Sequence, residues 1–295
     1  MEFARFNPGG TGVALVTPFS QGSIDFDSLG RIIDHVISGG VDYLVSLGTT
    51  GESSLLTEEE QIEVLSYTLQ HTNSRVKIVA GCFGGNNTKA LTEKVRHFDL
   101  TGISAILSSS PGYIKPIQEG IYQHYSALAQ ASALPIILYN VPSRTASNMS
   151  AETCLRLARD HANIIGIKDA SGDLYQGSII AKNKPSDFHL LSGDDQTALG
   201  LISCGATGVI SVVANAYPNI LSQMIIDGLH GRREKAADAH YRLLDLHPLL
   251  YCEGNPAGIK GALENLGLCS REVRLPLTAL TTETSNRLKI EMEKI

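Results

Sequence analysis

The chain has 295 residues, of which 24 are basic and 30 acidic, and its formal net charge is −6. This length is enough for one large α/β domain or for two domains of ordinary size, each with a buried core. The acidic balance, together with the lack of any run of lysines or arginines in the sequence, argues against a nucleic acid as partner.

From the sequence we expect no targeting or membrane segment. The first ten residues, MEFARFNPGG, lack an apolar core of signal-peptide length, and no run of about 18 apolar residues occurs. The 5 cysteines are widely spaced and form no C-x-x-C pair, which argues against both a disulfide framework and a zinc site. We therefore expect a cytoplasmic protein without a membrane span and without a bound metal.

Short runs of β-branched and apolar residues, bounded by Gly, Asn or Ser, recur along the chain. In order they are GVALVTPF (12–19), DYLVSLG (42–48), VKIVAGC (76–82), ISAILSS (103–109), PIILYN (135–140), IIGIKDA (164–170), HLLSGD (189–194) and TGVISVV (207–213). Nearly continuous apolar runs of this kind are typical of parallel strands that are buried on both faces.

Helical patterns separate these strands, with apolar residues near i, i+3 and i+4. Thr57 and Glu60 fit a capping box, Ser150 stands at an N-cap position, and the stretch Asn86-Asn87-Thr88 is suited to open a further helix. The patterns predict helices over 25–38, 57–71, 118–131 and 150–161.

Eight alternating β and α units predict a closed (β/α)8 barrel, an α/β fold of the TIM-barrel type. An open doubly wound sheet is the alternative, but it normally carries G-x-G-x-x-G after its first strand, where this chain has TPFSQG. Further helices are predicted over 218–229, 232–244, 256–266 and 276–294. We expect residues 1–225 to form the barrel and residues 226–295 to form a C-terminal helical extension packed on it.

Lys168 stands at the end of the sixth strand, where barrels carry catalytic groups. Strand alternation places Lys168 on the face of Ile164 and Gly166, and turns Asp169 to the opposite face. A lysine in a barrel mouth loses hydration of its ammonium form, which favours the neutral amine that forms Schiff bases with carbonyls. The alternative is a structural lysine in a buried ion pair with a neighbouring strand.

Polar groups at other strand ends suit a Schiff-base site. The loop SLGTTGESS (46–54) carries N–H groups at Thr49, Thr50 and Gly51 that can cradle a carboxylate, although such a loop can also be an ordinary turn. Tyr139 ends the fifth strand and can relay protons, and Arg144 in the next loop can bind a carboxylate with its fork of N–H groups.

Six segments in order, GTTGES, PGYIKP, LYNVPSRT, IIGIKDASGD, LLSGDD and GATGVISVVAN, resemble the dihydrodipicolinate synthase branch of the pyruvate-dependent class I aldolases. The resemblance runs from TPF at 17–19 to RLPLT at 274–278. It implies a homotetrameric lyase that joins pyruvate to L-aspartate 4-semialdehyde. The product would be 4-hydroxy-tetrahydrodipicolinate, on the way to diaminopimelate and lysine. The resemblance implies no metal and no organic cofactor.

The same resemblance assigns roles residue by residue. Lys168 matches the lysine that forms the Schiff base, and Tyr139 matches the proton donor and acceptor above it. Thr49 and Tyr113 match the rest of the proton relay, and Tyr113 is the residue lent to a neighbouring subunit in relatives.

Three further positions match substrate contacts: Thr50 and the backbone at Ile210 for pyruvate, and Arg144 for the carboxylate of the aldehyde. N-acetylneuraminate lyase and 2-keto-3-deoxy sugar acid aldolases share the barrel and the Schiff base and remain alternatives, because few residues separate these activities. GTTGE, and Arg144 after YNVP, favour the dihydrodipicolinate branch.

Departures from the family pattern concern inhibition by lysine. Relatives that lysine inhibits carry histidines where this chain has Glu58 and Gln61, a tyrosine where it has Gly112, and an acid where it has Lys89. These changes remove aromatic and cation-binding groups. We expect weak or absent inhibition, which an assay in millimolar lysine would check.

Two other classes of protein fit less well. A barrel that binds pyridoxal phosphate needs a phosphate cradle after the seventh and eighth strands, but SGDD places two acids there. A non-catalytic binding relative is expected to have lost Lys168 or Tyr139, and this chain keeps both.

Overall fold

The computed structural model describes residues 6–295. Eight parallel strands close into a barrel, in the spatial order β1, β10, β9, β8, β7, β6, β5, β4, as the sequence predicts. The strands are Gly10–Ala14 (β1), Tyr43–Ser46 (β4), Lys77–Ala80 (β5), Ala105–Ser109 (β6), Ile136–Asn140 (β7), Ile164–Asp169 (β8), His189–Ser192 (β9) and Gly208–Ser211 (β10). Residues 1–5, the first half of the segment MEFARFNPGG that is expected not to be a signal peptide, lie outside the described residues.

The first predicted strand is too long. β1 ends at Ala14, and Phe19–Ser20 (β2) instead pairs with Ser23–Ile24 (β3) in a separate antiparallel sheet. Pro18 lacks an N–H group and cannot continue a ladder. Val16 has already left it, because its N–H donates to the side chain of Asn215.

The helices follow the predicted pattern closely. They are Phe26–Ser38 (α1), Glu58–Thr72 (α2), Thr88–His97 (α3), Gln118–Ala131 (α4), Pro142–Thr145 (α5), Ala151–Asp160 (α6), Leu174–Asn183 (α7), Ala198–Ser203 (α8), Pro218–Leu229 (α9), Arg233–Leu244 (α10), Leu246–Tyr251 (α11), Ala257–Asn265 (α12) and Thr282–Met292 (α13), with 3-10 turns at Ser53–Leu55 (η1) and Val213–Asn215 (η2). The capping box of Thr57 and Glu60 is present, and Ser150 caps α6. The helix expected over 276–294 starts only at Thr282, because Thr281 extends the backbone and caps it.

By packing, the chain divides into two compact units. Ile78–Ile210 belongs to the first, and Gly10–Lys77 with Ser211–Ile295 forms the second. The division into a barrel over 1–225 and an extension over 226–295 stays a prediction.

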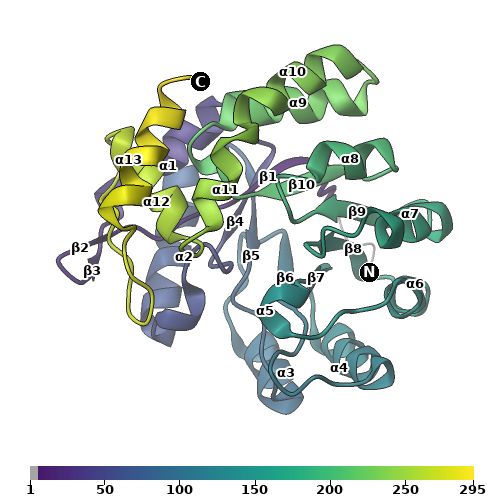
Figure 1. Cartoon of the computed structure of the whole chain (residues 1–295). Helices are drawn as coiled ribbons and strands as arrows, with labels where there is room; N and C mark the ends of the chain where they lie inside the picture. The colour runs from purple at the N-terminus through teal and green to yellow at the C-terminus, as the bar shows by residue number, and fades with distance from the viewer. Residues whose placement is uncertain (1–5) are drawn as a thin grey trace. The chain divides into compact units, whose positions relative to one another are not determined.

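In the first unit, helices α3, α4, α6 and α7 lie outside the strands β6 to β9 (Figure 1). The strands carry the buried core, including Ile106, Leu138 and Ile167. The register of β7 and β8 sets Tyr139 beside Lys168 and Asn140 beside Asp169. This register brings together the two side chains that the sequence marks for chemistry.

In the second unit, β1 pairs with β4, and α9 and α10 lie side by side (Figure 1). Helices α11 and α12 approach closely at Gly258, where an added Cβ would lie 2.3 Å from the carbonyl oxygen of Leu250. No helix within residues 6–295 is long and apolar enough to cross a membrane.

Candidate active site

Lys168 is buried at the C-terminal end of β8, with 5% of its surface exposed. Its Nζ lies 4.5 Å from the ring centroid of Tyr139, which is itself 7% exposed. No carboxylate of residues 6–295 lies within 4.0 Å of this nitrogen. For the described chain, the alternative of a buried structural ion pair at Lys168 is therefore wrong.

Asp169 faces away from Lys168, as strand alternation predicts. Its carboxylate accepts hydrogen bonds from the amides of Asn140 at 3.1 Å and Gln176 at 3.1 Å, and from the N–H of Ser171 at 3.0 Å. These donors are neutral, and the carboxylate is 3% exposed. This network fixes the ends of β7 and β8, and with them the positions of Tyr139 and Lys168.

Gly193 lies directly against Lys168, and the sequence did not point to it. A Cβ at this position would lie 3.0 Å from both Cγ and Cε of Lys168 and 2.7 Å from the Cβ of Ala170. The N–H of Gly193 donates to the carbonyl of Asp169 at 2.8 Å. A glycine directly after β9 was the available signal, because a strand end without a side chain leaves room for a neighbour.

Tyr113 and Arg144 lie on adjacent loops at the surface. The N–H of Tyr113 donates to the carbonyl of Thr145 at 3.1 Å, and the backbone of Tyr113 is left-handed with φ 68°. The Tyr113 side chain is 89% exposed and forms no hydrogen bond with Tyr139 in the described chain. Arg144 is exposed in α5, the turn that follows Tyr139.

Ile210 lies in β10 with a fully buried side chain. The backbone contact that the resemblance assigns to Ile210 stays a prediction.

Thr49 and Thr50 lie in a tight loop that follows β4 in the second unit. The N–H groups of Gly51 and Glu52 are used within the turn, by the carbonyls of Gly48 and Thr49. The N–H groups of Thr49 and Thr50 have no acceptor among residues 6–295. The prediction of a carboxylate cradle is therefore wrong for the N–H of Gly51. The N–H groups of Thr49 and Thr50 are still available for a carboxylate.

A (β/α)8 barrel with a buried, carboxylate-free lysine beside a tyrosine ring at a strand end defines a candidate enzyme that uses lysine as a nucleophile. The model of the "Dihydrodipicolinate synthetase family" matches residues 7–295, and the chain belongs to this family. The resemblance found in the sequence is thus confirmed.

Individual relatives agree with the family model. The chain is 48% identical over 282 residues to a 4-hydroxy-tetrahydrodipicolinate synthase of Flavobacterium psychrophilum, which covers 95% of this chain and 96% of the relative. The dihydrodipicolinate synthase structure from Aquifex aeolicus has a TM-score of 0.93 at 38% identity and covers 97% of both chains. A structure described as the first monomeric variant of this enzyme has a TM-score of 0.94 at 36% identity and covers 97% of this chain and 96% of its own.

Proposed function

We propose that this protein condenses pyruvate with L-aspartate 4-semialdehyde through a Schiff base, as a lyase of the 4-hydroxy-tetrahydrodipicolinate synthase type in the diaminopimelate and lysine pathway. The observation that carries the proposal is Lys168, buried without a carboxylate partner beside the ring of Tyr139. Relatives that bear this enzyme's name are 41% to 48% identical to the chain, which favours this reading over a sugar acid aldolase or N-acetylneuraminate lyase.

The chemistry follows from the two side chains. The neutral amine of Lys168 attacks the ketone carbon of pyruvate, and the carbonyl oxygen leaves as water to give an iminium. The iminium withdraws electrons, so the adjacent methyl group loses a proton and becomes an enamine that attacks the aldehyde carbon. The hydroxyl of Tyr139 carries protons into and out of these steps. The amino group of the L-aspartate 4-semialdehyde unit then attacks the new iminium and displaces Lys168, which closes the ring of 4-hydroxy-tetrahydrodipicolinate.

The remaining site residues are part of the proposal. Thr50 and the backbone of Ile210 hold the carboxylate of pyruvate, which the N–H groups of Thr49 and Thr50 support because they have no acceptor in the described chain. Arg144 binds the carboxylate of the aldehyde, which its exposed position in the turn after Tyr139 supports. Thr49 and Tyr113 extend the proton relay.

We also propose assembly into a homotetramer in which Tyr113 is lent to a neighbouring subunit. The loop between β6 and α4 exposes Tyr113 by 89%, Ile114 by 58% and Ile117 by 78%, an apolar surface that a second copy of the chain would bury. A monomeric variant exists among the relatives, so sedimentation of this protein is the measurement that decides. Residence in the cytoplasm and weak inhibition by lysine stay predictions.

Borohydride reduction in the presence of pyruvate tests the proposal. We expect a reduced pyruvyl adduct on Lys168 by peptide mass mapping, and turnover of L-aspartate 4-semialdehyde by the untreated protein. An adduct without that turnover would move the second substrate to a sugar acid. No adduct at all would overturn the Schiff-base mechanism.

A further inference from the structure

The loop that carries Thr49 and Thr50 is held by buried side chains from distant parts of the second unit. The hydroxyl of Thr17 donates to the carbonyl of Gly51 at 2.7 Å. The ammonium group of Lys260 donates to the carboxylate of Glu52 at 2.5 Å, and both side chains are 0% exposed. The loop is thus held at the two residues that directly follow Thr50, Gly51 and Glu52.

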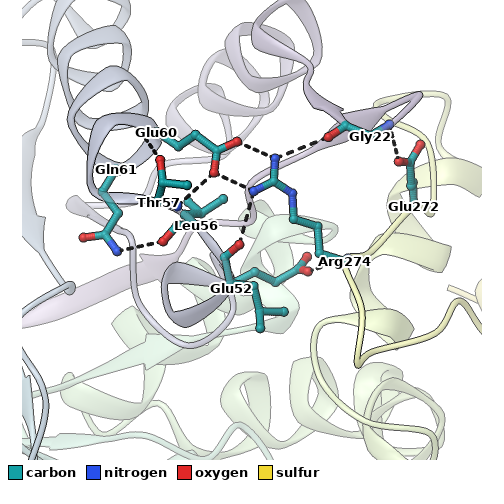
Figure 2. Close-up of polar contacts among 9 residues, drawn as sticks. Gly22, Glu52, Leu56, Thr57, Glu60, Gln61, Glu272 and Arg274 are labelled. Carbon is teal, nitrogen blue, oxygen red and sulfur yellow. Dashed lines mark hydrogen bonds and ion pairs between the residues drawn. The ribbon is translucent and has the colours of Figure 1, made fainter.

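An arginine secures the outer part of the same loop (Figure 2). The guanidinium of Arg274 contacts both carboxylate oxygens of Glu60, at 2.6 Å and 2.5 Å, and its backbone N–H donates to Glu52 at 3.0 Å. Glu272 accepts from the N–H of Gly22 at 2.7 Å. The loop after β4 therefore cannot move without breaking charged hydrogen bonds.

Asn255, another residue far from the loop in the sequence, contacts the side chain of Thr50, which is predicted to bind substrate. Its amide nitrogen donates to the hydroxyl oxygen of Thr50 at 3.0 Å, and both residues are buried. The chain on either side of Asn255 is also anchored: Glu253 accepts from the N–H of Thr281 at 2.7 Å, and Gly258 packs against Leu250.

We infer that Asn255 is a positioning residue that fixes the direction of the Thr50 hydroxyl. A hydroxyl has one proton to donate and two lone pairs. Since the amide of Asn255 occupies a lone pair, the proton of Thr50 points to another acceptor, and the hydroxyl donates to no group of residues 6–295.

The acceptor that this proton suits is a carboxylate, which takes stronger hydrogen bonds than a neutral group. The inference rests on the proposed function, in which Thr50 binds the carboxylate of pyruvate. The segment EGNPAGIK (253–260) thereby acts on substrate binding through Thr50, and not by touching the substrate.

The experiment measures the pyruvate concentration that gives half-maximal borohydride trapping in Asn255→Ala, Asn255→Asp, Thr50→Val and the double variant Thr50→Val with Asn255→Ala. For Asn255→Ala we expect this concentration to rise about tenfold, with little change in the adduct reached at saturation, because an oriented hydrogen bond to a charged group is weakened. Asn255→Asp keeps the shape of the side chain, but its carboxylate accepts the Thr50 proton. The pyruvate concentration for half-maximal trapping should therefore rise at least as much in this variant. Asn265→Ala, an exposed asparagine of α12, is the control and should match wild type.

Coupling between the two positions separates positioning from general packing. If Asn255 acts through Thr50, the double variant should be no weaker than Thr50→Val alone. Two results would overturn the inference: a double variant in which the increases of the two single variants multiply, or Asn255→Ala and Asn255→Asp proteins that need no more pyruvate than wild type. In either case the proposed function would stand as long as the wild-type protein forms the adduct. Failure of the wild-type protein to form any adduct would overturn both.

Discussion

Lys168 and Lys260 are two buried lysines with opposite surroundings, each in its own compact unit. Lys168 is 5% exposed and Lys260 is 0% exposed. Each ammonium nitrogen lies over an aromatic ring, 4.5 Å from the centroid of Tyr139 for Lys168 and 4.1 Å from that of Phe19 for Lys260. Lys260 also has a carboxylate partner, Glu52, whereas Lys168 has no ion pair within residues 6–295.

This difference shows that the partner of a buried lysine, and not its burial, indicates its role. Burial lowers the pKa of Lys260, and the carboxylate of Glu52 opposes that shift by stabilising the ammonium form. Lys260 also donates to the carbonyl of Glu272 at 2.8 Å, so its surroundings stabilise the charged ammonium form in one position. Lys168 has no carboxylate partner of this kind within residues 6–295.

Replacement of Lys168 should have the largest effect on activity. We expect Lys168→Ala to lower kcat by roughly four orders of magnitude or more, because the nucleophile is removed, and to abolish borohydride trapping. Steady-state assays with both substrates and mass mapping check this, and Lys182→Ala, an exposed lysine of α7, is the control. Trapping at another lysine of the Lys168→Ala protein would contradict the assignment.

Tyr139→Phe gives Lys168 the kind of ring that covers Lys260. The aromatic face remains, but the hydroxyl is lost, so we expect kcat to fall about 10²-fold to 10⁴-fold, the usual contribution of general acid–base catalysis. Phe19→Tyr makes the reciprocal change beside Lys260 and should leave borohydride trapping on Lys168 as it is. A Tyr139→Phe enzyme with near-normal kcat would show that the ring alone supports the chemistry.

The pair of Lys260 and Glu52 should govern stability. Lys260→Met or Glu52→Gln leaves a buried charge without its partner, and we expect each to lower the free energy of unfolding by about 3–5 kcal/mol. The double variant should recover much of that loss, because it removes both charges. Urea denaturation followed by circular dichroism measures these differences, and Lys294→Met, at an exposed ion pair, serves as control. Equal losses in the single and double variants would mean that packing, and not charge, stabilises this region.

The sequence pointed to Lys168, which has no ion pair within residues 6–295, and did not point to Lys260, which pairs with Glu52. Lys168 could be identified because it ends a recognisable strand, and its neighbour Tyr139 ends the strand before it. Lys260 and Glu52 are 208 residues apart, and no local pattern links them. Gly193 was missed for a similar reason, because its contact is with a residue of another strand: without a side chain, it leaves room for Lys168.

Errors in the predicted elements likewise came from contacts beyond the element itself. The first strand was predicted to reach Phe19 because GVALVTPF is apolar throughout, but the N–H of Val16 donates to Asn215, far along the chain. The helix over 276–294 lost its first turn and more to the extended backbone at Thr281. Periodicity reports which residues are buried, whereas long-range hydrogen bonds decide where an element ends.

The smallest predicted effect concerns the half-buried pair of Arg274 and Glu60, whose side chains are 22% and 25% exposed. The hydrogen bonds from Arg274 hold the pKa of Glu60 below its ordinary value of 4.5. A carboxyl with a lowered pKa in the folded state stabilises the fold above its unfolded pKa, and this contribution is lost as the pH falls through the folded value. At neutral pH, Arg274→Gln should therefore cost about 1 kcal/mol, an amount reduced by the partial exposure.

The pH dependence separates this ion pair from a loss of packing. The difference in unfolding free energy between wild type and Arg274→Gln should be full near pH 7 and should shrink as the pH falls below 4.5. Arg271→Gln is the matched control, because its partner Glu264 lies 3.4 Å away in an exposed pair and should contribute little at any pH. A difference for Arg274→Gln that stays constant with pH would instead assign the effect to the guanidinium stacked over Phe19, at 4.6 Å from the ring centroid. In that case aromatic contact, and not charge pairing, would be what secures the loop of Thr49 and Thr50.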